Sequence, residues 1–184
     1  MLPLGTPAPD FRLPDTNGRT VARDDFREAH ALLVAFLSNH CPYVQHIRDG
    51  FAKLAREYRD KGVTAVAINS NDIEAYPEDS PENMRKEAEA HGFTFPYLFD
   101  ESQEVAKAYH AACTPDFYLF DKGRRLVYRG QMDDSRPGNR MPVTGRDLRA
   151  ALEAVLKGRP VQLNQRPSVG CNIKWKPGNE PKQE

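Results

Sequence analysis

Three cysteines are the residues of this chain best suited to covalent chemistry, and they stand far apart at positions 41, 113 and 171. Cys41 directly precedes Pro42, at a point where an apolar strand is expected to end and a helix to begin. A thiol at a helix N-terminus is stabilised as the thiolate by unpaired backbone N–H groups and by the helix dipole. Cys41 is therefore predicted to be a nucleophile; the alternative is a small buried apolar residue, as free cysteines commonly are.

Position 44, three residues after Cys41, is Val. In a C-x-x-C oxidoreductase, a second thiol at this position would resolve the mixed disulfide that the first one forms. Val44 excludes that dithiol mechanism. Any sulfur that meets Cys41 must come from elsewhere in the chain or from another molecule.

The elements that must position Cys41 are those of a mixed α/β sheet. Continuous apolar runs of strand length predict central strands buried on both faces. Helical periodicity and capping residues predict helices between the strands, and Asn17-Gly18 and Asp121-Lys122-Gly123 predict hairpin turns. The expected strands are 10–13, 19–22, 31–37, 63–68, 95–99, 116–120 and 125–130, and the expected helices are 42–60, 80–91, 100–109 and 144–156.

This order predicts one domain over residues 1–158 and an irregular tail over 159–184, partly packed on the domain. The fold class is α/β, with a central mixed sheet flanked by helices and an N-terminal β-hairpin. A length of 184 residues suits a single core.

Three places in the sequence resemble the thioredoxin-like superfamily, in particular its AhpC/TSA–redoxin branch. Phe36 stands five residues before Cys41, as the aromatic residue of the thioredoxin active-site segment does. Thr114-Pro115 resembles the proline, cis in these proteins, that faces the active-site cysteine, and GTPAPDFRLPDTNGRTV resembles the branch's N-terminal hairpin. More narrowly, the chain resembles the peroxiredoxin-like subgroup with a single active-site cysteine.

The resemblance implies thiol-disulfide exchange through Cys41 and places Pro115 beside it. Cys113, two residues before Pro115, is then the first candidate for a resolving cysteine, and Cys171 in the tail is the second. Each could instead be a packing residue. If neither resolves, an external thiol such as glutathione or thioredoxin completes the cycle. The implied substrate contacts come from His40, Pro42, Tyr43, Thr114 and Pro115.

A peroxiredoxin-like thiol peroxidase is the alternative enzyme. The peroxidatic pattern P-x-x-x-T/S-x-x-C is matched by Ser38, but its proline position is Val34, and the peroxidatic cysteine aligns with Val44. An alternative of another class is a thioredoxin-fold binding module without turnover.

Composition and charge limit the remaining functions. Lys and Arg together equal Asp and Glu at 26 each, which argues against a nucleic-acid or anionic-membrane partner. No signal-like start and no membrane-length apolar run is visible, so the expected compartment is the cytoplasm. Scattered histidines near Cys41 do not have the paired spacing of a zinc site. We expect neither a metal nor a cofactor, and the sequence does not indicate the oligomeric state.

Overall fold

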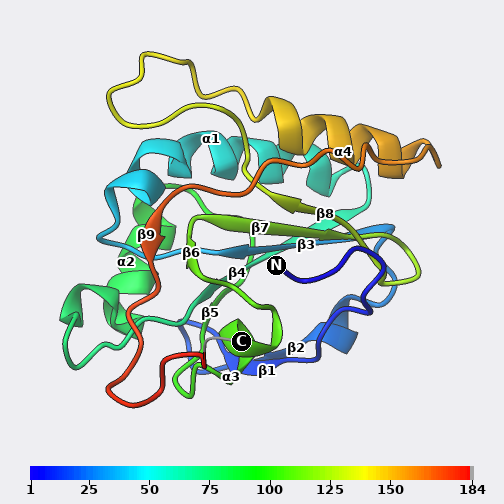
Figure 1. Cartoon of the computed structure of the whole chain (residues 1–184). Coiled ribbons are helices and arrows are strands. Elements are labelled where there is room, and N and C mark those ends of the chain that lie inside the picture. The colour runs from blue at the N-terminus through cyan, green and yellow to red at the C-terminus, as the bar shows by residue number, and fades with distance from the viewer. Residues whose placement is uncertain (183–184) are drawn as a thin grey trace.

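The computed structural model describes residues 1–182, so residues 183 and 184 of the predicted tail lie outside the described part. A central sheet, two short two-stranded sheets and four α-helices make up the fold (Figure 1). The strands are β1 (Arg12–Pro14), β2 (Thr20–Ala22), β3 (Ala31–Phe36), β4 (Val63–Asn69), β5 (Tyr97–Phe99), β6 (Cys113–Thr114), β7 (Asp116–Phe120), β8 (Leu126–Gly130) and β9 (Cys171–Asn172). The helices are α1 (Pro42–Arg59), α2 (Pro81–Ala90), α3 (Glu104–Ala108) and α4 (Arg146–Leu156), with 3-10 turns η1 (Arg23–Phe26) and η2 (Pro77–Asp79).

The central sheet has the strand order β5-β4-β3-β7-β8. Strands β3, β4 and β5 run parallel, whereas β7 is antiparallel to both β3 and β8. Phe36, the last residue of β3, pairs with Asp116, the first residue of β7. The end of β3, the start of α1 and the segment before β7 therefore meet at one end of these central strands.

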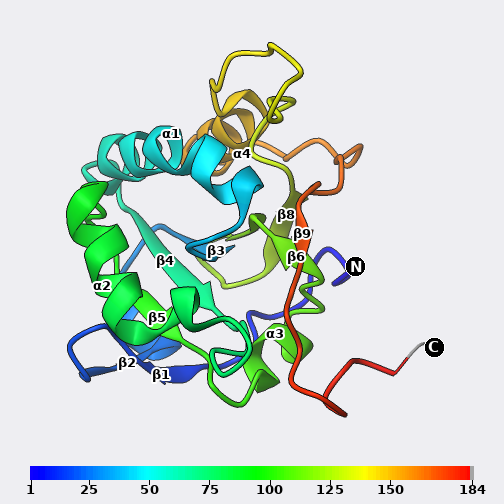
Figure 2. The ribbon, with the colours of Figure 1, turned by 90° about the vertical axis from the view of Figure 1, so that its left-hand side faces the viewer.

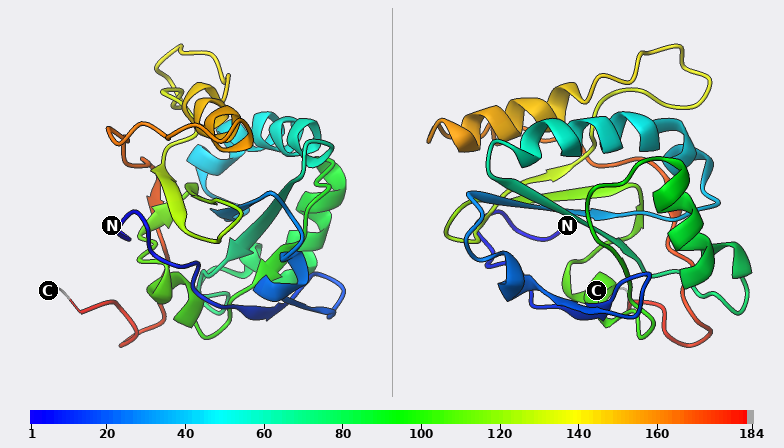
Figure 3. Two further views of the ribbon diagram at one scale, coloured as in Figure 1. Left: turned by 90° about the vertical axis from the view of Figure 1, so that its right-hand side faces the viewer. Right: turned by 180° about the vertical axis from the view of Figure 1, so that it is seen from behind.

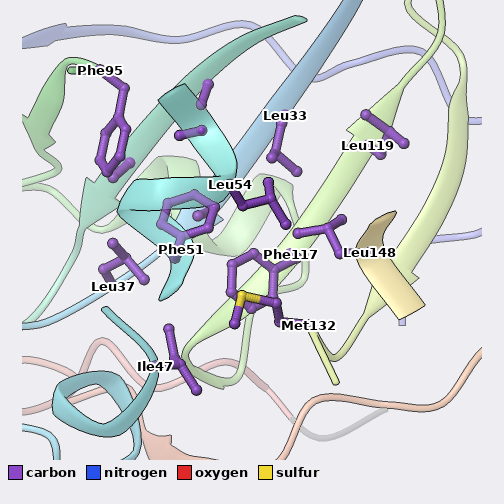
Figure 4. Packing of buried hydrophobic residues seen from close by; sticks show 14 of the residues in the cluster. Leu33, Leu37, Ile47, Phe51, Leu54, Phe95, Phe117, Leu119, Met132 and Leu148 are labelled. Atoms are coloured by element: carbon purple, nitrogen blue, oxygen red, sulfur yellow. The ribbon is translucent and has the colours of Figure 1, made fainter. Parts of the chain in front are cut away.

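Alternate residues of β3 enter two separate cores, as the period of two in a strand requires. Leu33 faces the core under α1, α2 and α4, where Phe51, Leu54 and Leu148 surround it (Figure 4). Val34 faces the second core, which the N-terminal segment and α3 cover. Every residue of β3 is buried, which explains its unbroken apolar sequence.

The predicted mixed α/β architecture is confirmed, including the hairpin that joins β1 and β2. The predicted irregular tail differs in one place, because β9 pairs with β6 in a separate small sheet. Figures 2 and 3 show this segment (orange to red) leaving α4 and returning to the sheet edge near the start of α1. Among the described residues, no helix is long and apolar enough to cross a membrane.

Candidate active site

Cys41 occupies the N-cap of α1, directly after the loop that leaves β3. Pro42 is the first helical residue, a position where its missing N–H costs no helical hydrogen bond. The side chain of Cys41 makes no capping hydrogen bond and is only 1% exposed. The local sequence thus placed the thiol at the helix start correctly, and the structure adds that it is covered.

The cover over Cys41 is Cys171. Their Sγ atoms lie 2.7 Å apart although the residues are 130 positions apart in the sequence, and both are free thiols. A disulfide bond of about 2.05 Å is within reach of a small side-chain movement. The structure thus brings Cys171, the second candidate of the sequence analysis, into contact with Cys41.

The pairing of β9 with β6 brings Cys171 to this place. Cys171 lies opposite Thr114, and Asn172 lies opposite Cys113, in an antiparallel register. A Cβ atom on Gly170 would overlap the Thr114 carbonyl oxygen and lie 2.7 Å from its carbonyl carbon. Only glycine permits so close an approach of the two backbones. Gly170 thus fixes the register that puts Cys171 against Cys41.

The sulfur of Cys113 contacts two backbone carbonyl groups. The Sγ atom lies 3.9 Å from the carbonyl oxygens of both Pro115 and Ser168. Burial, together with the charge of Asp116, raises the pKa of the Cys113 thiol to about 12. This thiol holds its proton at neutral pH and is a poor nucleophile.

Cys171 is the member of the pair that keeps a proton. Burial, followed by the hydrogen bond and the charge of Cys41, raises the pKa of the Cys171 thiol to about 11. The backbone N–H of Tyr43 in the first turn of α1 acts in the opposite direction by hydrogen bonding to the Cys171 sulfur.

The peptide bond between Thr114 and Pro115 is cis, as the resemblance implied. The Thr114 carbonyl oxygen lies 3.4 Å from the Cys41 sulfur. The Thr114 hydroxyl lies 3.2 Å from that of Ser38, and both residues are buried. Ser38 is thus in contact with Thr114.

His40, predicted to contact substrate, is held by a buried carboxylate. Its Nδ1 atom lies 2.5 Å from Asp79 Oδ2, and its ring stacks on Tyr76 with centroids 5.2 Å apart. Asp79 is fully buried and also accepts hydrogen bonds from the Asn39 backbone N–H and from the side-chain amide of Asn71. The sequence analysis missed this network, because residues 69–79 belong to none of its expected strands and helices.

Of the other predicted contact residues, Pro42 is exposed and Tyr43 is half-buried. Tyr43 and Pro115 line a narrow cleft together with Ser168 and Val169 of the tail. The structure therefore gathers Tyr43, Thr114 and Pro115 around the pair, together with a tail segment that the sequence analysis did not include.

A model of the AhpC/TSA family matches residues 4–129 of the chain. The chain belongs to the AhpC/TSA family. Cys41 and Cys113 lie within the matched region, whereas Cys171 lies beyond it.

Relatives of this AhpC/TSA protein include the thiol-disulfide oxidoreductase ResA of Geobacillus thermodenitrificans, 28% identical over 123 residues. That match covers 67% of this chain and 66% of ResA, a little under two thirds of its length. A Mycobacterium tuberculosis protein whose name classes it with the peroxiredoxins is 31% identical over 107 residues, which are 58% of this chain and 63% of that protein.

Two solved structures resemble the whole AhpC/TSA chain, tail included. Protein SMc02350 of Sinorhizobium meliloti is 57% identical with a TM-score of 0.95, and the match covers 97% of each chain. A Geobacillus kaustophilus protein is 58% identical with a TM-score of 0.94, covering 97% of this chain and 95% of that one. Peroxidoxin BcpB of Mycobacterium tuberculosis, 18% identical with a TM-score of 0.63 over 86% of this chain and 98% of that one, shares the fold. The fold is thioredoxin-like.

Proposed function

We propose that this protein is a thiol-disulfide oxidoreductase that cycles between a Cys41–Cys171 dithiol and a Cys41–Cys171 disulfide. The observation that carries the proposal is the 2.7 Å separation of the two sulfurs at the N-terminus of α1. Its family and the names of its relatives, which include ResA and a peroxiredoxin, support a thiol oxidoreductase in general.

The proposed cycle balances without a cofactor. In the reducing direction the dithiol donates two electrons and two protons to an external disulfide, which leaves as two thiols while the Cys41–Cys171 bond forms. In the other direction two external thiols reduce that bond and leave as a disulfide. Cys41 supplies the thiolate because its helix start stabilises negative charge and Cys171 retains its proton.

Turnover tests the proposal. The wild-type protein should accelerate the exchange between reduced glutathione and bis(2-hydroxyethyl) disulfide, followed through glutathione reductase and NADPH. Cys41→Ser and Cys171→Ser should each lose most of this activity, whereas Cys113→Ser should retain it. Equal loss in all three variants would contradict the assignment of the pair, and no activity in the wild type would favour a binding module.

The same proteins separate a reductase from a peroxidase. The engagement of Ser38 with Thr114, together with Val34 and Val44, argues against a dedicated peroxide site. We expect neither Cys41 nor Cys171 to react with hydrogen peroxide faster than an ordinary free thiol. A peroxide rate far above that, with slow disulfide exchange, would establish the peroxidase instead.

The proposed setting is the reducing cytoplasm, with low-molecular-weight or protein thiols as partners. Three widely spaced cysteines do not form a disulfide framework, which is the usual sign of an oxidising compartment. Cell fractionation with an antibody to the native protein tests the location; recovery with an extracytoplasmic marker would contradict it.

A further inference from the structure

The two sulfurs differ in how an outside molecule can reach them. Cys41 is 1% exposed, and its sulfur faces the Thr114 carbonyl and Cys171. Cys171 is partly exposed. A reagent that approaches the closed structure therefore meets Cys171 before Cys41.

The tail that carries Cys171 is fastened before the cysteine. The backbone N–H of Gln131 donates to the Arg166 carbonyl at 3.1 Å, and Gln165 bonds to the β8 backbone through both ends of its side-chain amide. Gly130 leaves room for this contact, because a Cβ there would overlap the Arg166 carbonyl oxygen.

The tail is also fastened after the cysteine. Gln103, fully buried, donates from its amide nitrogen to the carbonyls of Ser70 and Lys174 at 2.8 and 2.9 Å. Its amide oxygen accepts from the Lys176 backbone N–H and the Asn179 side chain at 3.0 and 2.7 Å. All four hydrogen-bonding positions of the amide are thus used. Cys171 is clamped on both sides, so Cys41 stays covered in the folded protein.

The clamped tail also determines which partners fit. An extended polypeptide that bound here would have to pair with the backbone of Cys113–Thr114, as peptides that bind to the edge of a sheet usually do. That edge already pairs with β9, and Gly170 lies against the Thr114 carbonyl. What remains is a narrow cleft lined by Tyr43, Pro115 and Val169, so a partner that needs no backbone pairing is favoured over an extended polypeptide.

We propose that Cys171, and not Cys41, is the sulfur that exchanges with outside thiols, and that its partners are low-molecular-weight thiols and disulfides. This inference rests on the proposed Cys41–Cys171 cycle. An external thiolate attacks Cys171 Sγ of the disulfide, the Cys41–Cys171 bond breaks, and Cys41 leaves as the thiolate at the start of α1. A second external thiolate then attacks the sulfur of the external thiol that is bound to Cys171 in the mixed disulfide. Cys171 is released and takes up a proton, and the two external thiols leave as a disulfide.

The reverse direction uses the same contact. Cys171 transfers its proton to the Cys41 thiolate across 2.7 Å and attacks the external disulfide, whose second half leaves as a thiolate. Cys41, deprotonated again as that thiolate takes up the proton, then attacks Cys171 Sγ and expels the remaining external thiolate. The pair thus acts as an outer sulfur that meets the partner and an inner sulfur that accepts the charge.

The decisive experiment uses the oxidised full-length protein and reduced glutathione. The reaction is stopped with acid after milliseconds, which freezes thiol exchange, and the glutathione adduct is located by peptide mass spectrometry under acidic digestion. We expect at least tenfold more adduct on Cys171 than on Cys41. A majority on Cys41 would overturn the inference while leaving the cycle intact, whereas failure to form a Cys41–Cys171 disulfide at all would overturn the cycle itself.

Partner size is tested by comparing rate constants for reduction of the oxidised protein, each corrected for the thiolate fraction of the reductant. Glutathione should react at least as fast as a reduced thioredoxin, because a protein surface must displace the clamped tail. A thioredoxin that reacts tenfold faster than glutathione would refute the restriction to small partners. Gln103→Ala, which releases the tail, should lower the ratio of the rate constant with glutathione to that with thioredoxin. If this ratio is unchanged, the contacts that hold the tail do not select the partner.

Discussion

Replacement of Gly170 by alanine is expected to separate the two sulfurs without touching either. The added Cβ would overlap the Thr114 carbonyl oxygen and lie 2.7 Å from its carbonyl carbon and 3.2 Å from Pro115 Cδ. The obstacle is backbone, which cannot rotate away as a side chain would. Strand β9 must therefore move off β6, and Cys171 must move with it.

The size of the effect follows from the cost of forcing a methyl group into a packed site, about 1–3 kcal/mol. The disulfide form needs the close approach, whereas the dithiol form can relax. Most of that cost therefore appears in the equilibrium constant for forming the Cys41–Cys171 bond. At about 1.4 kcal/mol for each factor of ten, the equilibrium constant for the Cys41–Cys171 bond should be lower than in the wild type. The reduction should lie between about fivefold and somewhat over a hundredfold.

The assay equilibrates the full-length protein with glutathione redox buffers and measures the oxidised fraction after acid quenching and alkylation. Gly123→Ala is the matched control, because Gly123 has an ordinary φ and its Cβ would meet only a side-chain oxygen of Asp121 at 3.4 Å. The control should match the wild type. If Gly170→Ala formed the disulfide as readily as the wild type, the argument that Gly170 sets the position of Cys171 would be refuted.

Three further perturbations test other parts of the account. Burial raises the pKa of Asp116 to about 6, so the folded state binds more protons than the unfolded state between about pH 4 and 6, and the free energy of unfolding falls as pH rises through that window. Between pH 4 and pH 7, urea unfolding should show the wild type losing up to about 3 kcal/mol of stability relative to Asp116→Asn. A stability difference between the two proteins that does not change with pH would contradict this. Cys113, with its raised pKa, should be alkylated by iodoacetamide at pH 8 far more slowly than in the unfolded chain, and equal rates would contradict its burial. Gln103→Ala should lower the free energy of unfolding by about 2 kcal/mol or more, because it leaves buried backbone groups without hydrogen-bond partners. It should also speed tryptic cleavage after Lys174, and an unchanged cleavage rate would contradict the claim that Gln103 holds the tail.

The part of the site that the sequence predicted is the part set by local signals. Cys41 precedes Pro42, and a proline suits the first turn of a helix, so the N-cap position follows from neighbouring residues. The strand before it, Ala31–Phe36, is apolar throughout and had to be buried on both faces. Fold class and the place of the first cysteine therefore came from short-range patterns.

Cys171 could not be placed in this way. Its contact with Cys41 closes a loop of 130 residues through a tail with no sustained periodicity. The available signal was Gly170, because a glycine beside a cysteine in an otherwise extended segment marks a close backbone approach. The apolar Ile173, buried in the second core, was a sign that the tail packs, but neither residue reveals which strand it pairs with.

The buried network around Asp79 was missed for a related reason. Asn69 ends β4, and Asn71 and Asp79 follow in a run of polar residues, which is the usual composition of an exposed loop. They are buried because they satisfy one another's hydrogen bonds and hold His40. Sequence patterns record polarity and do not show whether polar groups are paired in the interior.

The most direct test of the central claim is to oxidise the native protein with one equivalent of diamide and map its disulfides by mass spectrometry after trapping free thiols. The structure predicts a single intramolecular bond between Cys41 and Cys171, with Cys113 alkylated. The Cys113→Ser variant should give the same bond. A bond between Cys41 and Cys113, or a Cys41 thiol that stays free, would contradict the account.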